Sequence, residues 1–291
     1  MGMTDTPMSP TVWRRWLAFE LTRLRRVAGL EQKDVAKALR CTVTKVSYIE
    51  NAERPVVLRD LDEVLLGLYG VPEDRWSSYL QAAKKSRQKG WWERYSADAL
   101  PEWLSLYIGL EQGAEQLRVY DAQLITGVLQ TEDYAQAIVR RGTAELTEEQ
   151  ISRRVEFRSS RRAVLTRELD PLRLWVVLDE AVLRRVVGNR AVMRDQLQHL
   201  ADVADQAKVT LQVFPFEHGA HPGMQGPFTI LDFPWPTDPG VVYIEHRSGA
   251  VYLETPAEIK DHTVAFEHLC AHALPPDESV ALIRDIAREY Q

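Results

Sequence analysis

Residues 42–51 combine side chains that could read the base edges of DNA with side chains that anchor a helix. The segment reads TVTKVSYIEN, and the hydroxyl of Thr42 can cap a helix that starts after it. At helical spacing Val46 and Ile49 face a core, which leaves Val43, Thr44, Ser47 and Tyr48 pointing outward. A recognition helix reads the major groove with residues near its N-terminus. The pattern therefore predicts a double-stranded DNA reader.

The elements needed to position such a helix are present on both sides of it. Residues 32–39 predict a preceding short helix, whose Ala36 is small enough for the close crossing that a helix-turn-helix requires. Apolar spacing also predicts helices over residues 13–28 and 58–69, and no strand before residue 75. We expect a helix-turn-helix domain over residues 11–75.

A basic run, KKSRQKG, closes a further predicted helix and marks a domain boundary. Residues 76–90 are predicted to form a connecting helix and basic linker, and residues 91–291 a regulatory or partner-binding domain. The predicted fold class is an all-α helix-turn-helix N-terminal domain followed by an α/β (mixed α+β) C-terminal domain, in which a strand, a helix and a strand form a βαβ unit. Predicted strands are 172–178, 209–214, 227–233, 241–246 and 250–254, and predicted helices are 91–118, 131–141, 147–168, 189–206, 256–273 and 277–290.

Residues 21–55 resemble the Cro/C1-type (xenobiotic-response-element, XRE) helix-turn-helix family. The matching positions are Leu24, Gly29, Leu30, Gln32, Val35, Ala36, Val46, Ser47, Ile49, Glu50 and Pro55. The resemblance implies that Arg25 and Glu50 form an internal ion pair, and that Gln32 bonds a phosphate. It also implies that Val43, Thr44 and Ser47 face bases while Lys45, Asn51 and Arg54 lie nearest the backbone. The complete DNA-binding prediction is Gln32, Lys33, Thr42, Val43, Thr44, Lys45, Ser47, Tyr48, Asn51 and Arg54.

Three positions depart from the family pattern. Arg40 and Ala52 stand where the family usually has Gly, and Glu31 replaces the usual Ser or Thr cap before Gln32. If Arg40 keeps the left-handed conformation, it costs about 1 kcal/mol. We expect these three departures to destabilise the turns and the helix cap locally and to leave the fold unchanged.

The rest of the chain is similar to the WhiJ-like C-terminal domain of actinomycete regulators. The similar stretches are WWERY (91–95), LPEWLSLYIGLEQGA (100–114), ITGVLQTEDYA (125–135), LRLWVVLDEAVLRR (172–185), MRDQLQHL (193–200), VTLQVFPFEHGAHPGMQGPFTILDFP (209–234) and VVYIE (241–245). The resemblance implies an antitoxin-like transcriptional regulator, often paired with a small acidic protein encoded nearby. It implies no catalytic activity.

Histidines in the second part of the chain offer alternative chemistry. Glu217, His218 and His221 share a Pro/Gly-rich loop, and His268 and His272 lie one helical turn apart. No complete set of metal ligands has the required spacing, so we expect no metal, no cofactor and no enzyme activity. An enzyme that uses the His218/His221 loop is the least favoured hypothesis.

The predicted helix 147–168 carries many arginines. They could form a docking face for an acidic partner or an anion site, or a solvated face paired with Glu148, Glu149, Glu156 and Glu168, which we favour. The arginines are Arg153, Arg154, Arg158, Arg161, Arg162 and Arg167.

Charge is distributed unevenly over the 291 residues, whose net charge is −6. Residues 1–90 carry a net +5 and the remainder −11, as expected for a DNA reader joined to an acidic effector domain. With two cysteines, no signal peptide and no membrane-spanning run, the sequence predicts a soluble cytoplasmic protein. We predict a homodimeric transcriptional regulator that binds a palindromic operator and responds to a small protein partner. The alternative is that its C-terminal domain senses a small-molecule ligand.

Overall fold

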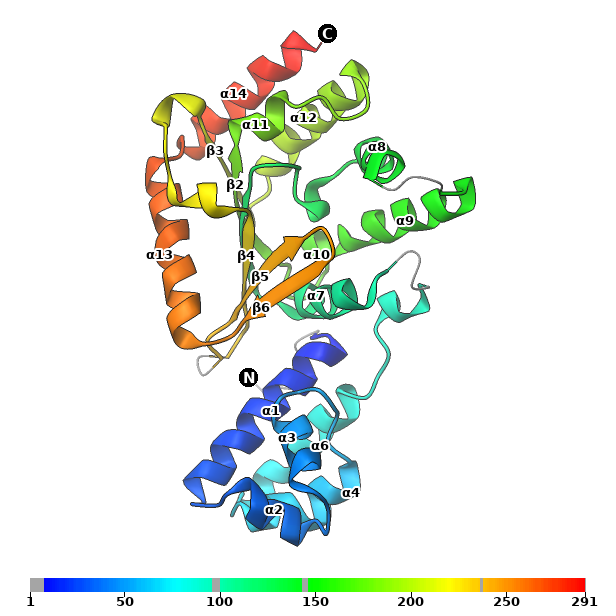
Figure 1. Ribbon diagram of the computed structural model, residues 1–291, viewed down its shortest axis with the longest axis vertical. Helices are drawn as coiled ribbons and strands as arrows, with labels where there is room; N and C mark the ends of the chain where they lie inside the picture. The colour runs from blue at the N-terminus through cyan, green and yellow to red at the C-terminus, as the bar shows by residue number, and fades with distance from the viewer. Residues whose placement is uncertain (1–7, 96–99, 143–145, 236–237, 291) are drawn as a thin grey trace. The chain divides into compact units, whose positions relative to one another are not determined.

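The computed structural model describes residues 8–95, 100–142, 146–235 and 238–290 (Figure 1). The chain divides into two compact units, Met1–Glu93 and Arg94–Gln291, each of which is described by itself. The predicted linker at residues 76–90 thus lies inside the first unit. The two units confirm the predicted fold class of a helical N-terminal part and a mixed C-terminal part.

The described part of the first unit is helical. The segment predicted as one helix over 58–69 contains a π-helical turn, Leu61–Leu65, between two short α-helices. A 3-10 turn, Glu73–Arg75, leads into the last helix of the unit. The α-helices are α1 (Pro10–Val27), α2 (Gln32–Ala38), α3 (Val43–Glu50), α4 (Leu58–Asp60), α5 (Leu66–Leu68) and α6 (Trp76–Lys85).

Aromatic packing joins α6 to α1. Trp16 stacks on Tyr79 with ring centroids 5.4 Å apart, and both side chains are buried. The Tyr79 hydroxyl donates to Glu20 over 3.2 Å, and this contact satisfies a polar group inside the core. The helix predicted as a connector is therefore a structural part of the first unit.

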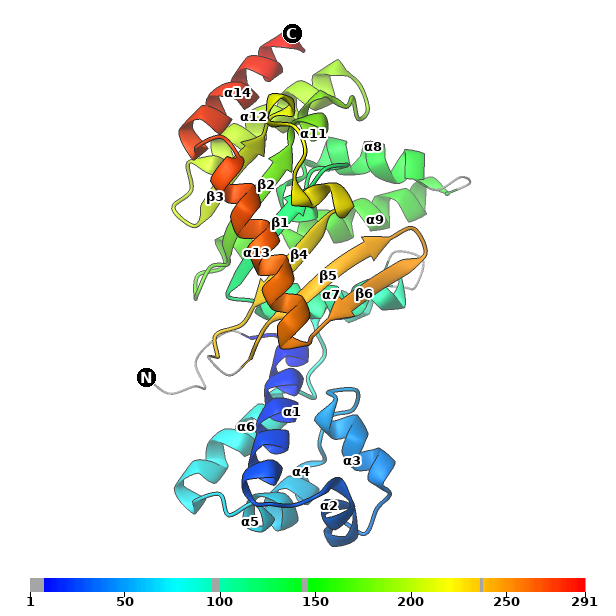
Figure 2. The ribbon, with the colours of Figure 1, turned by 60° about the vertical axis from the view of Figure 1, so that its left-hand side comes forward.

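The second unit contains a mixed sheet in the strand order β3-β2-β1-β4-β5-β6. β1, β2 and β3 are parallel, whereas β4, β5 and β6 form an antiparallel meander (Figure 2). The chain passes from β2 to β3 through helices, which confirms the predicted βαβ unit. The strands are β1 (Gln116–Asp121), β2 (Arg173–Asp179), β3 (Val209–Phe214), β4 (Phe228–Asp232), β5 (Val241–His246) and β6 (Gly249–Leu253).

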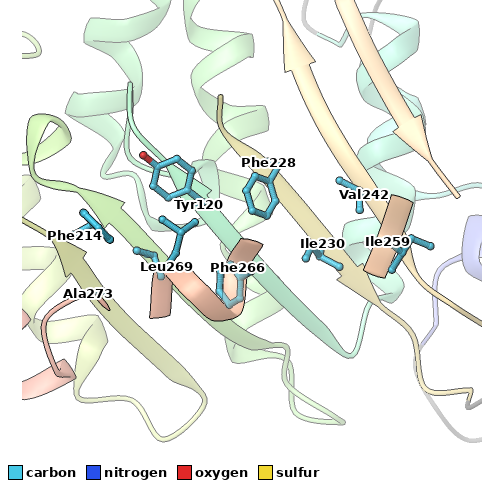
Figure 3. Packing of buried hydrophobic residues seen from close by; sticks show 10 residues of the cluster. Tyr120, Phe214, Phe228, Ile230, Val242, Ile259, Phe266, Leu269 and Ala273 are labelled. Atoms are coloured by element: carbon cyan, nitrogen blue, oxygen red, sulfur yellow. The ribbon is translucent and has the colours of Figure 1, made fainter. Parts of the chain in front are cut away.

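Helices cover both faces of this sheet. Successive strand residues point to opposite faces, and the two faces meet different helices: Val242 packs with Phe266 in one cluster (Figure 3), whereas Tyr243 packs against Tyr107. Figure 1 shows α13 on one side of the sheet and α7 and α9 on the other. The helices are α7 (Glu102–Gly113), α8 (Glu132–Gly142), α9 (Glu148–Arg161), α10 (Ala163–Thr166), α11 (Glu180–Arg184), α12 (Arg190–Ala204), α13 (Pro256–His272) and α14 (Pro276–Glu289).

Two of the predicted elements are wrong in their extent. The predicted helix 91–118 contains a 3-10 turn and α7, and its residues 96–99 lie outside the described part of the chain. Its last residues belong to the start of β1, a strand in the middle of the sheet. Ala114 is already extended, with φ −68° and ψ 147°, so the helix ends before the strand begins. The predicted helix 147–168 likewise ends at Arg161, and α10 follows as a separate short helix.

Candidate nucleic-acid interface

The helix-turn-helix pair is held together by a small apolar contact set. Val46 and Ile49 of α3 and Val35 and Ala36 of α2 are all buried, as their spacing predicts. The Thr42 hydroxyl accepts from the Lys45 backbone N–H over 3.3 Å and so caps α3. The start of α3 is therefore fixed, and the residues that follow it take defined directions.

The N-terminus of α2 is capped without a Ser or Thr. The backbone N–H of Glu31 donates to the Asp34 carboxylate over 2.9 Å, one half of a capping box. Asp34 also places negative charge in the first turn, where the helix dipole favours it. The departure at Glu31 thus leaves α2 capped.

Both glycine substitutions in the motif are accommodated in left-handed backbone. Arg40 has φ 51° and Ala52 has φ 60°. The chain therefore keeps the turn geometry of the family pattern, at a cost of about 1 kcal/mol for each non-glycine residue. Their effect is on stability, since α2 and α3 are both formed.

An ion-pair network joins three helices behind the outward surface. Arg25 donates twice to Glu50, over 2.6 and 2.9 Å, which confirms the predicted pair, and once to the Leu30 carbonyl over 2.8 Å. The Gln32 amide donates to the same Glu50 carboxylate over 2.9 Å. Hydrogen bonding to Glu50 raises the pKa of Arg25, because it favours the charged guanidinium. Glu50 thus fixes α1, α2 and α3 relative to one another.

The surface of α3 presents the side chains that the sequence singles out as base readers. Thr42, Val43 and Thr44 are exposed, while Ser47 and Tyr48 are half-buried. Hydroxyl groups and a small apolar side chain at one helix end suit hydrogen bonds and methyl contacts in the major groove. These residues lie along α3 and its N-cap, and the most exposed of them are at the start of the helix, where a recognition helix reads bases.

The predicted backbone contacts lie around this surface, but several are already engaged. Lys45 forms a 2.6 Å ion pair with Asp60 of α4, and Lys33 pairs with Glu31 at 2.6 Å. The Asn51 amide donates to Ser47 over 3.4 Å. Sequence reasoning missed Asp60 because it lies beyond the motif, on the next helix.

Arg54 and Tyr48 form a further contact at the end of the recognition segment. The guanidinium of Arg54 lies 5.0 Å from the centre of the Tyr48 ring, within cation–π range. Arg54 is exposed. Stacking restricts the arginine while leaving its fork of N–H donors available to a phosphate.

The histidine loop of the second unit is joined to its neighbours by hydrogen bonds. His218 Nδ1 lies 2.6 Å from the His272 carbonyl oxygen, and His221 Nε2 lies 3.5 Å from Asp179. His268 and His272 stack with ring centroids 4.1 Å apart. Within the described residues, no group of three or more His, Cys, Asp or Glu side chains is arranged to hold a metal ion.

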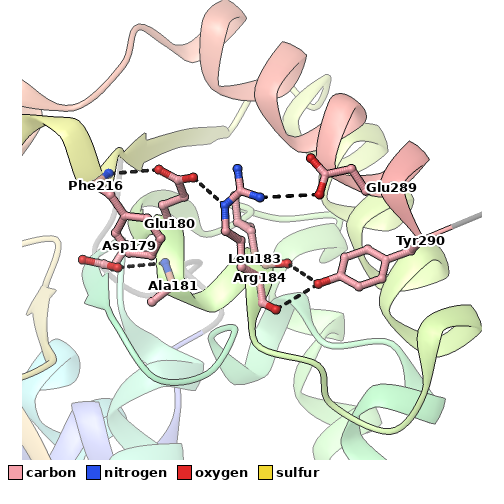
Figure 4. A network of polar contacts seen from close by, with 8 residues as sticks. All are labelled: Asp179, Glu180, Ala181, Leu183, Arg184, Phe216, Glu289 and Tyr290. Atoms are coloured by element: carbon pink, nitrogen blue, oxygen red, sulfur yellow. Dashed lines mark hydrogen bonds and ion pairs between the residues drawn. The ribbon is translucent and has the colours of Figure 1, made fainter.

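Acidic side chains at the end of β2 and the start of α11 connect neighbouring elements through hydrogen bonds (Figure 4). Asp179 accepts from the Ala181 N–H and caps α11, and Glu180 accepts from Arg184 and from the Phe216 N–H. The Tyr290 hydroxyl donates to backbone carbonyls at the end of α11. The network ties α11 to the turn that follows β3 and to the end of α14.

The arginines of α9 and the segment after it have divergent roles. Arg161 is buried and donates twice to Glu111, over 3.0 and 2.7 Å. Arg167 donates to carbonyls at the C-terminal end of α7. Arg153 pairs with Glu149 on the exposed surface. The favoured prediction of one solvated face of paired arginines is therefore wrong for Arg161 and Arg167, which contact α7. These two side chains are likewise not available for the alternative, a docking face for an acidic partner.

Comparison with known protein families agrees with the two structural units. Residues 16–95 match a family model described as a helix-turn-helix domain, which makes the first unit a DNA-binding module of that class. Residues 104–285, more than half of the chain, match the model described as "Domain of unknown function (DUF5753)", and the chain belongs to this family. No curated protein and no solved structure matches the chain. None of the described helices combines the length and apolar character needed to cross a membrane.

Proposed function

We propose that the protein is a sequence-specific transcriptional regulator that acts in the cytoplasm. One observation carries the proposal: α3 presents Val43, Thr44 and Ser47 outward from a helix whose position is fixed by the Arg25–Glu50–Gln32 network. A rigid scaffold that presents short polar side chains at a helix N-terminus is what base readout in the major groove requires. The assigned helix-turn-helix domain supports the same conclusion.

In this proposal the interface residues divide into two roles. Val43, Thr44 and Ser47 contact base edges, with Thr42 and Tyr48 at the margin of that surface. The phosphate contacts are made by Gln32, Lys33, Lys45, Asn51 and Arg54.

We also propose that the second unit mediates homodimerisation and the response to a small acidic protein partner. Two copies of α3 would then read half-sites about one helical turn apart, so the operator would be palindromic. The resemblance of this unit to WhiJ-like regulators is what supports the protein partner. Co-purification of a small acidic protein with the tagged chain from its native host tests this part independently of the operator.

In-vitro selection from random duplex DNA at physiological salt tests the reading function. We expect the wild type to enrich a palindrome that the variant Thr44→Ala/Ser47→Ala no longer enriches. The variant Thr166→Ala/Ser152→Ala removes the same groups from exposed positions of the second unit and should enrich the wild-type site. No enrichment by the wild type, with or without a co-purified partner, would contradict the proposal.

A further inference from the structure

The second unit contains a polar cavity that the DNA-reading function does not use. Its volume is about 420 Å³, and it is lined by α7, the end of β1 and the loop after it, α9, β4 and β5. Tyr107 and Tyr243 contribute aromatic surface, with their ring centroids 4.2 Å apart. This volume falls in the range of small-molecule sites.

The Arg158 side chain lines this cavity, and the described residues provide few hydrogen-bond acceptors for its positive charge. Within the described part of the chain, the only hydrogen bond of the Arg158 side chain is a 3.5 Å contact to the side-chain amide oxygen (Oε1) of Gln130. Gln130 is itself fixed by donation to the Ile125 carbonyl over 2.6 Å. Burial, with a contribution from nearby Arg161, lowers the pKa of Arg158 to about 10. A half-buried guanidinium with one weak partner is suited to an anionic group from outside.

The charge of the neighbouring Arg161, in contrast, is paired within the protein. Glu111 holds it with two hydrogen bonds, so its charge is balanced within the protein. A Cβ on Gly127 would lie 2.5 Å from Arg161 Nη1, so glycine at this position lets the loop pass close to the arginine. Arg161 is therefore part of the wall, whereas Arg158 keeps most of its donors for a ligand. The exposed Arg247 also lines the cavity.

An unpartnered carboxyl group lies in the same cavity. Asp121 ends β1, and the described residues give its carboxyl group no hydrogen-bond partner. Burial raises the pKa of Asp121 to about 8, with Glu245 adding to the effect. Glu245 also lines the cavity and accepts from the Tyr243 hydroxyl over 3.1 Å. An arriving amino group would allow Asp121 to ionise, because it supplies the missing opposite charge.

The position in the sheet agrees with a binding role. The chain adds β2 and β3 on one side of β1 and then β4, β5 and β6 on the other, so the end of β1 lies where the strand order reverses. In α/β folds ligands bind outside the carboxyl ends of parallel strands at such points. Asp121 lies at that end.

We propose that this cavity binds a small zwitterion, with its anionic group on Arg158, its amino group on Asp121 and its remaining surface against Tyr107 and Tyr243. Amino acids and their close derivatives are the chemical class that carries these groups. Filling the cavity changes the DNA affinity of the regulator; that consequence, unlike the binding itself, rests on the proposed function.

Calorimetric titration of the full chain without DNA tests the binding, with the standard amino acids as probes. We expect at least one to bind, and its decarboxylated and N-acetylated forms to bind at least about tenfold more weakly, since each lacks one of the two groups. Arg158→Gln and Asp121→Asn should each weaken binding by a similar factor. Arg153→Gln, a solvent-exposed arginine of the same helix, should leave it unchanged.

Several results would overturn the proposal. These are no binding by any amino acid, equal binding of the decarboxylated or N-acetylated form, and full affinity in the two cavity variants. Since the single-group probes are titrated against the wild type, the test stands even if a variant fails to fold. Because no DNA is present, failure here is distinct from failure of the DNA-reading function. Repeating the operator titration with the bound amino acid then tests the regulatory consequence.

Discussion

At the residue scale, Lys45 is shared between the protein and the DNA it is proposed to bind. Its ion pair with Asp60 competes with a phosphate for the same ammonium group. We predict that Asp60→Asn strengthens binding to both random and selected duplexes by about two- to fivefold, the value of a partly exposed ion pair. Equilibrium binding measured by fluorescence anisotropy gives both affinities.

Asp62→Asn is the matched control, because it removes the same charge from an exposed neighbour in the same helical segment. An equal gain in the two variants would assign the effect to net charge and contradict the competition. Lys45→Ala should weaken binding to all sequences similarly and lower the salt slope by about one.

The carboxyl group of Asp121 predicts an unusual dependence of stability on pH. Its pKa is about 8 in the folded chain against an ordinary value of 3.8, so the folded state keeps a proton that the unfolded state releases. This contribution to the free energy of unfolding therefore falls as pH rises from about 4 to about 8. The charged groups that act on Asp121 are Glu245 of β5, which raises its pKa, and Arg161 of α9, which lowers it.

The variant Asp121→Asn cannot lose that proton. We predict that its free energy of unfolding, measured by urea denaturation, rises relative to the wild type between about pH 5 and about pH 8. Glu149→Gln is a control for removal of an exposed carboxylate. Wild-type and Asp121→Asn profiles that run parallel would show that Asp121 titrates normally.

At the element scale, one buried ion pair fixes α9 on α7. The Arg161 side chain is 8% exposed and that of Glu111 is 0% exposed. Although burial opposes the charge of Arg161, Glu111 outweighs it and raises the arginine's pKa. We predict that Glu111→Gln lowers the free energy of unfolding by about 3–5 kcal/mol, because it leaves a buried charge uncompensated.

The exposed pair on the same helix provides the comparison. Glu149→Gln breaks the contact to Arg153 in solvent and should cost at most about 1 kcal/mol. Urea denaturation of the two variants compares the losses in their free energies of unfolding. Similar losses in both would mean that the Glu111–Arg161 pair has no special role in holding α9.

The turn between α2 and α3 contains a second element-scale prediction. Arg40 is exposed and occupies left-handed backbone. Arg40→Gly should raise the free energy of unfolding by up to about 1 kcal/mol, because glycine adopts this conformation without the Cβ clash. Arg40→Ala removes the same charge but keeps the Cβ, and should give no such gain. Equal stability of the two variants in thermal unfolding would contradict the strain argument.

The elements were predictable from the sequence where one physical signal dominated. Apolar runs rich in β-branched residues gave β2 to β6, and the helix-turn-helix followed from residue spacing and family resemblance. β1 was missed although Gly113 precedes it, because Ala114, Leu117 and Tyr120 continue the helical spacing of Leu110. Only pairing with β2 and β4, which are distant in sequence, makes Gln116–Asp121 a strand.

The same reasoning explains what was missed at the candidate sites. Thr42, Val46 and Ile49 were predictable because capping and burial depend on neighbours within a turn or two. The Lys45–Asp60 pair and the Asp121–Arg158 cavity depend on residues that tertiary folding brings together. The local sequence pattern does not distinguish the arginines of α9 that are buried from those that are exposed.

At the scale of the whole chain, charge is divided between a basic DNA-binding part and an acidic remainder. Residues 1–90 carry a net +5, while the whole chain has −6. Electrostatic attraction between the helix-turn-helix unit and phosphates is therefore opposed by the second unit's own charge. Non-specific capture by DNA should be weak for the full chain, which leaves base contacts to supply more of its affinity.

This balance predicts how fast each form of the protein finds DNA. The fragment 1–93 is a compact unit with its own buried Trp16–Tyr79 core. We predict that it associates with a random-sequence duplex about tenfold faster than the full chain at about 50 mM salt, and at a similar rate at about 200 mM. Stopped-flow anisotropy gives the association rate of each form, expressed per protomer. Equal rates at low salt would mean that the acidic unit does not act on DNA encounter, and specificity would then have to be explained by the contacts of α3 alone.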